Sequence, residues 1–130
     1  PQLFDLNDDG LLDLILGKKT GELKYYENIG TTASPSFSLL NDTLGGIDLS
    51  VDNTKGYAAP HFFKFQDTIR LLLGNFEGNI LFYDGIRDHL KKGEEFNLVD
   101  DHFRQIAVEA YSSCWVEDRF RWESRFICWR

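Results

Sequence analysis

No stretch of the sequence approaches the roughly eighteen consecutive apolar residues of a membrane-spanning helix, so no membrane span is predicted. Basic residues are scarce as well: 14 Lys and Arg stand against 21 Asp and Glu, which gives a net charge of −7. A nucleic-acid-binding surface needs clustered Lys and Arg, so no nucleic-acid partner is predicted. A charged leader with an apolar core is also missing. Because the chain begins at Pro1 inside an expected strand, we interpret it as a fragment. The missing leader therefore indicates nothing about the compartment.

Motifs of known catalytic chemistry are missing too. There is no Gly-x-Ser-x-Gly elbow and no Cys/His arrangement typical of a nucleophile. Lys18-Lys19-Thr20 stands between two glycines but lacks the order of a phosphate loop, which favours a basic hairpin turn. Glu94-Glu95 and Asp100-Asp101 lie in polar connections, where solvated faces are expected more than acid-base groups. The histidines lack zinc-ligand spacing and are expected on the surface or in strands; they are His61, His89 and His102.

What the sequence does contain favours a packed, strand-rich fold. The 130 residues are enough for one small domain. With 42% hydrophobic and 15% aromatic residues, the chain differs from a disordered one.

The most informative stretch is residues 5–13, which read Asp-Leu-Asn-Asp-Asp-Gly-Leu-Leu-Asp. Oxygen-bearing side chains occupy every second position of its first half, and Gly10 permits the sharp turn that a wrapped loop needs. A hard cation takes about six to eight oxygens, which these groups nearly supply. We therefore predict a Ca²⁺ site whose ligands are the side chains of Asp5, Asn7, Asp9 and Asp13 and the main-chain carbonyl of Leu11.

Two alternatives compete with this interpretation. An EF-hand would need a Glu at the twelfth loop position and a helix after it, whereas Leu16 stands there. The run Leu14-Ile15-Leu16, which ends at Gly17, predicts a buried strand instead. The second alternative is a solvated acidic turn that binds nothing, because Asp, Asn and Gly are also common turn residues.

The sequence also contains an internal repeat. Residues 14–29 align without a gap on residues 71–86, so Leu14 corresponds to Leu71, 57 positions later. Each copy reads as a strand, a turn flanked by two glycines and a second strand. Further strands are expected before and behind each copy, at residues 1–4 and 60–65, and at 37–40 and 96–99. Four short antiparallel strands per unit are typical of a propeller blade.

The fold class predicted from this pattern is all-β: about two four-stranded antiparallel blades of a β-propeller plus an incomplete third. The first unit covers residues 1–58 and contains the calcium loop. The second covers residues 59–103, and there Lys64, Gln66 and Asp67 replace the string of acids while Arg70 stands in place of Asp13. We therefore predict a tight turn without metal in the second unit. Residues 104–130 are expected to start a third unit.

Residues 4–17 resemble an FG-GAP or VCBS repeat, the unit of integrin-α-like β-propellers. Glu27-Asn28-Ile29-Gly30-Thr31, with Pro35 and Phe37, is similar to the continuation common in secreted bacterial members. The resemblance covers roughly residues 1–113. It implies that the matched loop residues bind calcium at a turn between neighbouring strands of a blade. It also implies that the remaining blades of a longer parent chain complete the fold.

The last seventeen residues differ abruptly in composition. They hold all three tryptophans and both cysteines, Cys114 and Cys128. We hypothesise that this tail is read in a shifted frame: codons taken across Trp122-Glu123 and Trp129-Arg130 must each give Gly, and the positions between permit a copy of residues 9–17. The alternative is a genuine amphipathic tail that caps an edge strand. The disulfide state of the two cysteines stays open.

These observations predict a non-catalytic, calcium-stabilised propeller segment of a secreted or cell-surface protein that acts in adhesion or binds a protein or glycan. The loop at residues 41–55 is long and rich in Gly and Asp, so it is a candidate for binding. The alternative is part of a polysaccharide-degrading enzyme such as a lyase, because the resemblance extends to propellers in such proteins.

Overall fold

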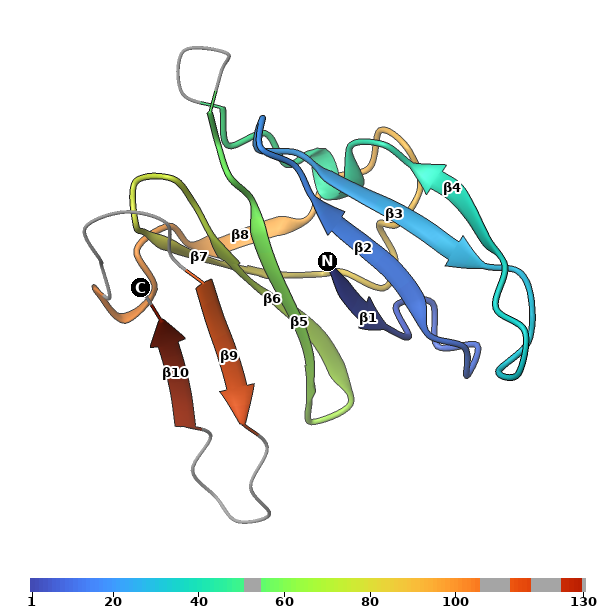
Figure 1. Ribbon diagram of the computed structural model, residues 1–130. Helices are drawn as coiled ribbons and strands as arrows, with labels where there is room; N and C mark the ends of the chain where they lie inside the picture. Colours follow the sequence, from blue (N-terminus) through green and yellow to red (C-terminus); the bar gives the residue numbers. More distant parts are fainter. Residues whose placement is uncertain (51–54, 106–112, 118–124, 130) are drawn as a thin grey trace.

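The computed structural model describes residues 1–50, 55–105, 113–117 and 125–129, and these form antiparallel β-sheets (Figure 1). The first sheet has the order β1 (Gln2–Phe4), β2 (Asp13–Gly17), β3 (Leu23–Asn28) and β4 (Phe37–Asn41). The second has the order β5 (Ala59–Phe65), β6 (Thr68–Gly74), β7 (Ile80–Asp84) and β8 (Asn97–Asp100). The remaining elements are two short 3-10 turns, η1 (Leu44–Gly46) and η2 (Phe103–Gln105), and the paired strands β9 (Ser113–Glu117) and β10 (Arg125–Trp129).

The prediction of an all-β chain with two four-stranded antiparallel sheets is confirmed. Neither four-stranded sheet closes on itself. The described residues contain no helix with the length and hydropathy needed to span a bilayer.

The sequence repeat extends to the details of the backbone. In the first sheet Ile15 is opposite Tyr25, and in the second Leu72 is opposite Phe82, 57 residues later in both strands. The β3–β4 ladder shifts register after Tyr25, and the β7–β8 ladder shifts at the corresponding residue, Phe82. The hairpin turns also match, because both are closed by two main-chain hydrogen bonds at corresponding positions. The two sheets are therefore the same structural unit.

Each sheet has two faces, which we call front and back and define by the side chains they carry. The front face of the second sheet carries Phe62, Leu71, Leu73, Leu81 and Tyr83. The back face of the first sheet carries Phe4, Ile15, Leu23 and Tyr25. These two faces pack on each other and form the main hydrophobic core.

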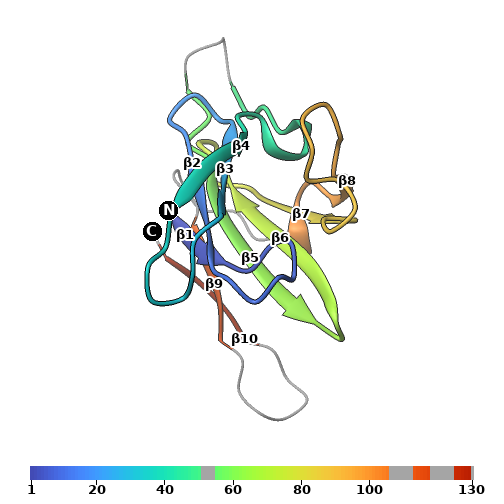
Figure 2. The same cartoon turned by 90° about the vertical axis from the view of Figure 1, so that its right-hand side faces the viewer.

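The two sheets also meet through their first strands. β5 lies beside β1 and β2 (Figure 1 and Figure 2). The Gln2 side chain bridges the strands, because its Nε2 donates to the Phe62 carbonyl at 2.8 Å and its Oε1 accepts from the Phe62 N–H at 2.7 Å. β9 lies against β5 and β6 in a similar way. The backbone of β9 thus follows the second sheet much as β5 follows the first.

The connection between β4 and β5 packs against both sheets, although its Gly- and Asp-rich sequence is typical of an exposed loop. Leu44 and Ile47 are buried in the core, and the buried Asn41 donates from Nδ2 to the Leu90 carbonyl at 3.1 Å. A Cβ at Gly17 would lie 1.8 Å from the carbonyl oxygen of Ala58, so this glycine allows the returning chain to approach β2. The first part of the loop predicted for binding is therefore structural. Residues 51–54 of that loop lie outside the described residues.

Beyond Gln105, the third predicted unit is described only at the backbone of β9 and β10. Their register places Cys114 opposite Cys128. Residues 106–112, 118–124 and 130 lie outside the described part of the chain, so the shifted reading frame stays a hypothesis.

Candidate metal centre

The predicted calcium loop joins β1 to β2 at one end of the first sheet. A strand follows the loop, since β2 begins at Asp13, which agrees with the sheet context expected and excludes an EF-hand here. The loop turns sharply at two residues with left-handed backbone, Asp8 (φ 66°) and Gly10 (φ 87°).

Three of the predicted ligands fold around one bend of this loop. Asp5 Oδ1 and Asn7 Oδ1 each accept from the N–H of Asp9 at 3.1 Å, and Asp5 Oδ2 accepts from the N–H of Gly10 at 2.9 Å. Asp9 Oδ1 accepts from the N–H of Leu11 at 2.7 Å. Consecutive main-chain N–H groups thus gather the oxygens of Asp5, Asn7 and Asp9 into one short turn.

Asp13 has a different environment, because it is completely buried under the loop. Its Oδ2 accepts from the Leu6 N–H at 3.1 Å and from the Tyr25 hydroxyl at 2.9 Å, and its Oδ1 accepts from the Asn28 N–H at 2.9 Å. These three bonds tie both ends of the loop to β3. Burial and the Asp13 carboxylate together raise the pKa of Tyr25 far above its usual range.

The donor chemistry of the loop fits a hard cation. A carboxylate offers about four lone-pair sites and an amide oxygen two, so the side chains of Asp5, Asn7, Asp9 and Asp13 each keep acceptor capacity after these bonds. In the described part of the chain, however, no three Asp, Glu, His or Cys side chains converge as a metal-binding group.

Two acidic residues near the loop were not singled out by sequence reasoning. Glu27 comes from β3, and its Oε1 accepts from Asn7 Nδ2 at 3.2 Å. Asp8 lies at the tip of the loop and forms ion pairs with Lys64 of β5, at 3.2 Å, and with Arg87 of the connection between β7 and β8. Only the strand pairing and the sheet packing bring these groups together, so no signal in the loop itself could have found them.

The charges of the loop are unequally compensated. Asp8 is paired with two cations, whereas Asp5, Asp9 and Asp13 form no ion pair with any part of the chain that the structure describes. Three carboxylates within nine residues repel one another unless a cation is bound among them.

The second sheet has no such loop at the corresponding position. Gln66 and Asp67 form a two-residue turn between β5 and β6, and both have positive φ, 48° and 62°, as a type I′ hairpin turn requires. The predicted tight turn is confirmed. Arg70, which replaces Asp13, lies over the rings of Phe65, at 5.2 Å, and Phe82, at 5.8 Å. Phe82 corresponds to Tyr25, so a cation–aromatic contact replaces the hydroxyl–carboxylate bond of the first sheet.

The lesser candidates lie apart from this loop. Lys18 pairs with Glu22 at 2.9 Å in the β2–β3 turn, which is the basic hairpin turn predicted. His61 lies in β5, where burial lowers its pKa, and His89 is exposed. His102 is exposed and pairs with Asp101 at 2.9 Å, which raises the pKa of the histidine.

Comparisons with family models, with curated proteins and with solved structures found no match to this chain.

Proposed function

We propose that residues 5–13 bind Ca²⁺ and that the ion is a structural part of the first sheet. The proposed ligands are Asp5, Asn7, Asp9, the Leu11 carbonyl and Asp13. The observation that carries the proposal is the charge imbalance: these three carboxylates have no counter-cation in the described chain, whereas the neighbouring Asp8 has two. When bound, the ion would supply the missing positive charge and hold the loop between β1 and β2 in one conformation.

We further infer that the two sheets are blades of a β-propeller of the FG-GAP or VCBS type. The proposal is supported by the shared register and bulge of the two sheets and by their face-to-face packing. The position of β9 against β5 and β6 supports a third unit, so the division into units 1–58, 59–103 and 104–130 is part of the same proposal.

The biological role that fits this arrangement is non-catalytic binding at the cell surface or outside the cell. Extracellular calcium modules have dissociation constants of about 10⁻⁴ M or weaker, so millimolar calcium would stabilise the fold by roughly 1.5 kcal/mol. At the sub-micromolar calcium of a cytosol, the same site would stay empty. The propeller faces would present loops to an extracellular protein or glycan. The polysaccharide-degrading alternative stays a prediction.

The loop offers a matched pair of variants for a test of calcium binding. Asp9→Asn removes one charge from a proposed ligand, and Asp8→Asn removes the same charge one position away. We expect titration calorimetry to show heat of calcium binding for the unsubstituted 130-residue chain and for Asp8→Asn. For Asp9→Asn we expect the calcium affinity to fall at least tenfold. The rise in melting temperature from EDTA to calcium should follow the same ranking. Equal effects of the two variants, or a parent chain that does not respond to calcium, would contradict the proposal.

A further inference from the structure

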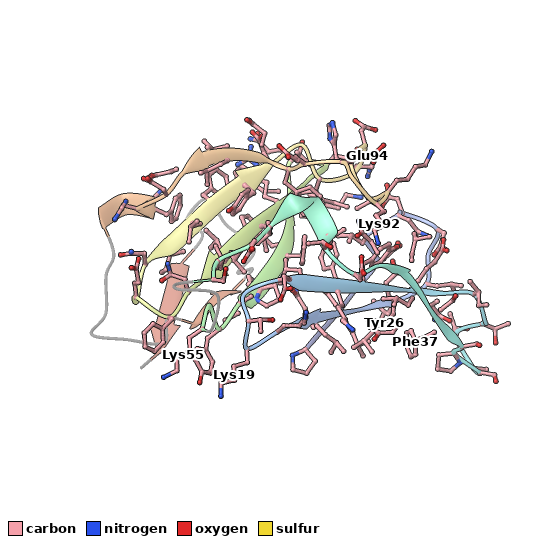
Figure 3. The ribbon with its side chains drawn as sticks, turned by 90° about the horizontal axis from the view of Figure 1, so that it is seen from above. Lys19, Tyr26, Phe37, Lys55, Lys92 and Glu94 are labelled. Atoms are coloured by element: carbon pink, nitrogen blue, oxygen red, sulfur yellow. The ribbon has the colours of Figure 1, made fainter. Side chains whose placement is uncertain are left out.

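We infer that the front face of the first sheet is a docking surface for another four-stranded sheet of the same repeat. This front face is the side turned away from the second sheet. It carries Leu3, Leu14, Leu16, Tyr26, Phe37 and Leu39. Figure 3 shows the labelled Tyr26 and Phe37 together on this side.

The surface is apolar and largely open. A row of residues directly opposite one another crosses all four strands, namely Leu3, Leu14, Tyr26 and Leu39. Leu3 is 55% exposed and Leu39 is 48% exposed, while Leu14 and Tyr26 are half-buried. Phe37 beside this row is 41% exposed. Folded chains seldom leave a contiguous apolar patch of this kind uncovered.

The second sheet shows what happens to the same row when it is covered. There the corresponding residues are Phe62, Leu71, Tyr83 and Leu98. Phe62 is 1% exposed, Leu71 is completely buried and Tyr83 is 8% exposed, while Leu98 at the outer edge is 49% exposed. Leu14 and Tyr26 pair as Leu71 and Tyr83 do and are the same residue types, so the difference in their exposure comes from what packs on the face.

The cover of the second sheet defines the chemistry of the expected occupant. That cover is the back face of the first sheet, on which Ile15, Leu23 and Tyr25 are completely buried. Since the rows that cross the two front faces are apolar at every corresponding position, a sheet with an aliphatic and aromatic back face of this kind fits both. The occupant is therefore a repeat unit and not a peptide strand or a small molecule.

A position beside the apolar row is charged in the first sheet and apolar in the second. Lys24 stands where the second sheet has Leu81. Leu81 keeps 9% exposure, which places this position at the margin of the packed area. A lysine there can cover apolar surface with its stem while its ammonium group reaches water. Lys24 is thus compatible with docking.

This inference rests on the repeated packing proposed for the propeller, but it requires neither the metal nor a closed ring. It can be tested by a 189-residue tandem chain in which residues 1–59 precede the complete 130-residue sequence. Pro1 then takes the place of Pro60, with which it aligns. The added unit can place its Ile15, Leu23 and Tyr25 over the original front face.

Hydroxyl-radical footprinting would report the exposure of the side chains concerned. We expect oxidation of the original Leu3, whose peptide is distinguished by the residues of the added copy before Pro1, to fall at least threefold in the tandem chain, while oxidation of Leu98 stays unchanged as an internal reference. Leu14→Lys in the original copy should abolish this protection. The protection should be the same in calcium and in EDTA. The docking inference can therefore be tested even if the chain does not bind calcium.

Two measurements on the 130-residue chain complete the test. Leu14→Lys should leave its unfolding midpoint nearly unchanged, whereas Leu71→Lys, at the covered position, should unfold it. Sedimentation velocity should show a monomer. An unprotected Leu3 of the original copy in the tandem chain would overturn the inference. So would equal damage by the two lysine substitutions, or a dimer of the 130-residue chain with a protected front face, because the occupant would then be a second copy.

Discussion

Asp13→Asn should destabilise the protein strongly even when no calcium is present. The substitution keeps the size of the side chain but replaces one carboxylate oxygen by an NH₂ group. In the structure, Oδ1 faces the N–H of Asn28 and Oδ2 faces the N–H of Leu6. Whichever way the new amide is turned, it directs a donor at one of these main-chain donors.

The magnitude follows from the three hydrogen bonds of this buried carboxylate. One main-chain N–H loses its acceptor inside the protein, which costs about 1–3 kcal/mol. The remaining bonds are no longer charge-assisted, which weakens them by about 1 kcal/mol in total or somewhat more. The expected loss is thus about 3 kcal/mol, a large part of the stability of a typical domain. In a chain of this size the melting temperature should fall by about 10 °C.

The assay is urea unfolding in EDTA, followed by circular dichroism. EDTA removes any contribution of Asp13 as a metal ligand, so the measurement isolates its role as an anchor. Tyr25→Phe is the graded control: it removes one of the three bonds and should cost about 1 kcal/mol. Asp9→Asn is the positional control, because its carboxylate lies in the exposed bend and should matter little in EDTA.

The reasoning would be refuted if Asp13→Asn remained within about 0.5 kcal/mol of the parent in EDTA, which is the usual range of a surface substitution. Such a result would mean that the three donors find other acceptors. The loop would then not be anchored through this residue.

Three further predictions concern the backbone and one histidine. Gly17→Ala should lower the free energy of unfolding by about 2 kcal/mol in urea, because the new Cβ overlaps the Ala58 carbonyl. Gly10→Ala should lower it by only about 1 kcal/mol, because there is open space at this position and only the backbone, at φ +87°, is unfavourable for alanine. The reverse order of the two costs would contradict the close approach at Gly17. Gln66→Asn should stabilise the chain by about 0.5 kcal/mol, because asparagine adopts the positive φ of a type I′ turn more readily, and a lower urea midpoint would argue against that turn. Burial lowers the pKa of His61, so its contribution to stability is complete above its unfolded pKa of about 6.5 and is lost as the pH falls through the folded value. His61→Gln, which introduces the residue at the corresponding position of β1, should therefore reduce the loss of unfolding free energy between pH 7.5 and pH 5, and an unchanged pH dependence would exclude His61 as its source.

The strands could be predicted from the sequence because each rests on a local signal. Leu14-Ile15-Leu16 and its copy at residues 71–73 are apolar runs between turn residues, and the structure has strands at both places. The bend at Asp8 and Gly10 and the tight turn at Gln66 and Asp67 are equally local. Short-range steric and hydrogen-bonding preferences decide these features, so the order of residues was sufficient.

The missed features depend on contacts between distant segments. Asp8 was given no role from the sequence, yet it forms ion pairs with Lys64 and Arg87, which only the packing of the second sheet brings to it. Leu44 and Ile47 were assigned to a binding loop because glycine and aspartate surround them, but both are buried in the core between the two sheets. Asp13 was interpreted as a ligand alone, and its role under Tyr25 became visible only from the pairing of β2 with β3.

The order of strands in both sheets has a consequence for how the chain acquires its structure. Each strand pairs with the one just before it, β1 with β2 through to β4, and β5 with β6 through to β8. Every ladder therefore closes a short stretch of backbone, and the entropy lost on closure is small at each step. A chain of this kind can assemble each sheet as a unit while it emerges from the ribosome, before the segment for the next one has been synthesised.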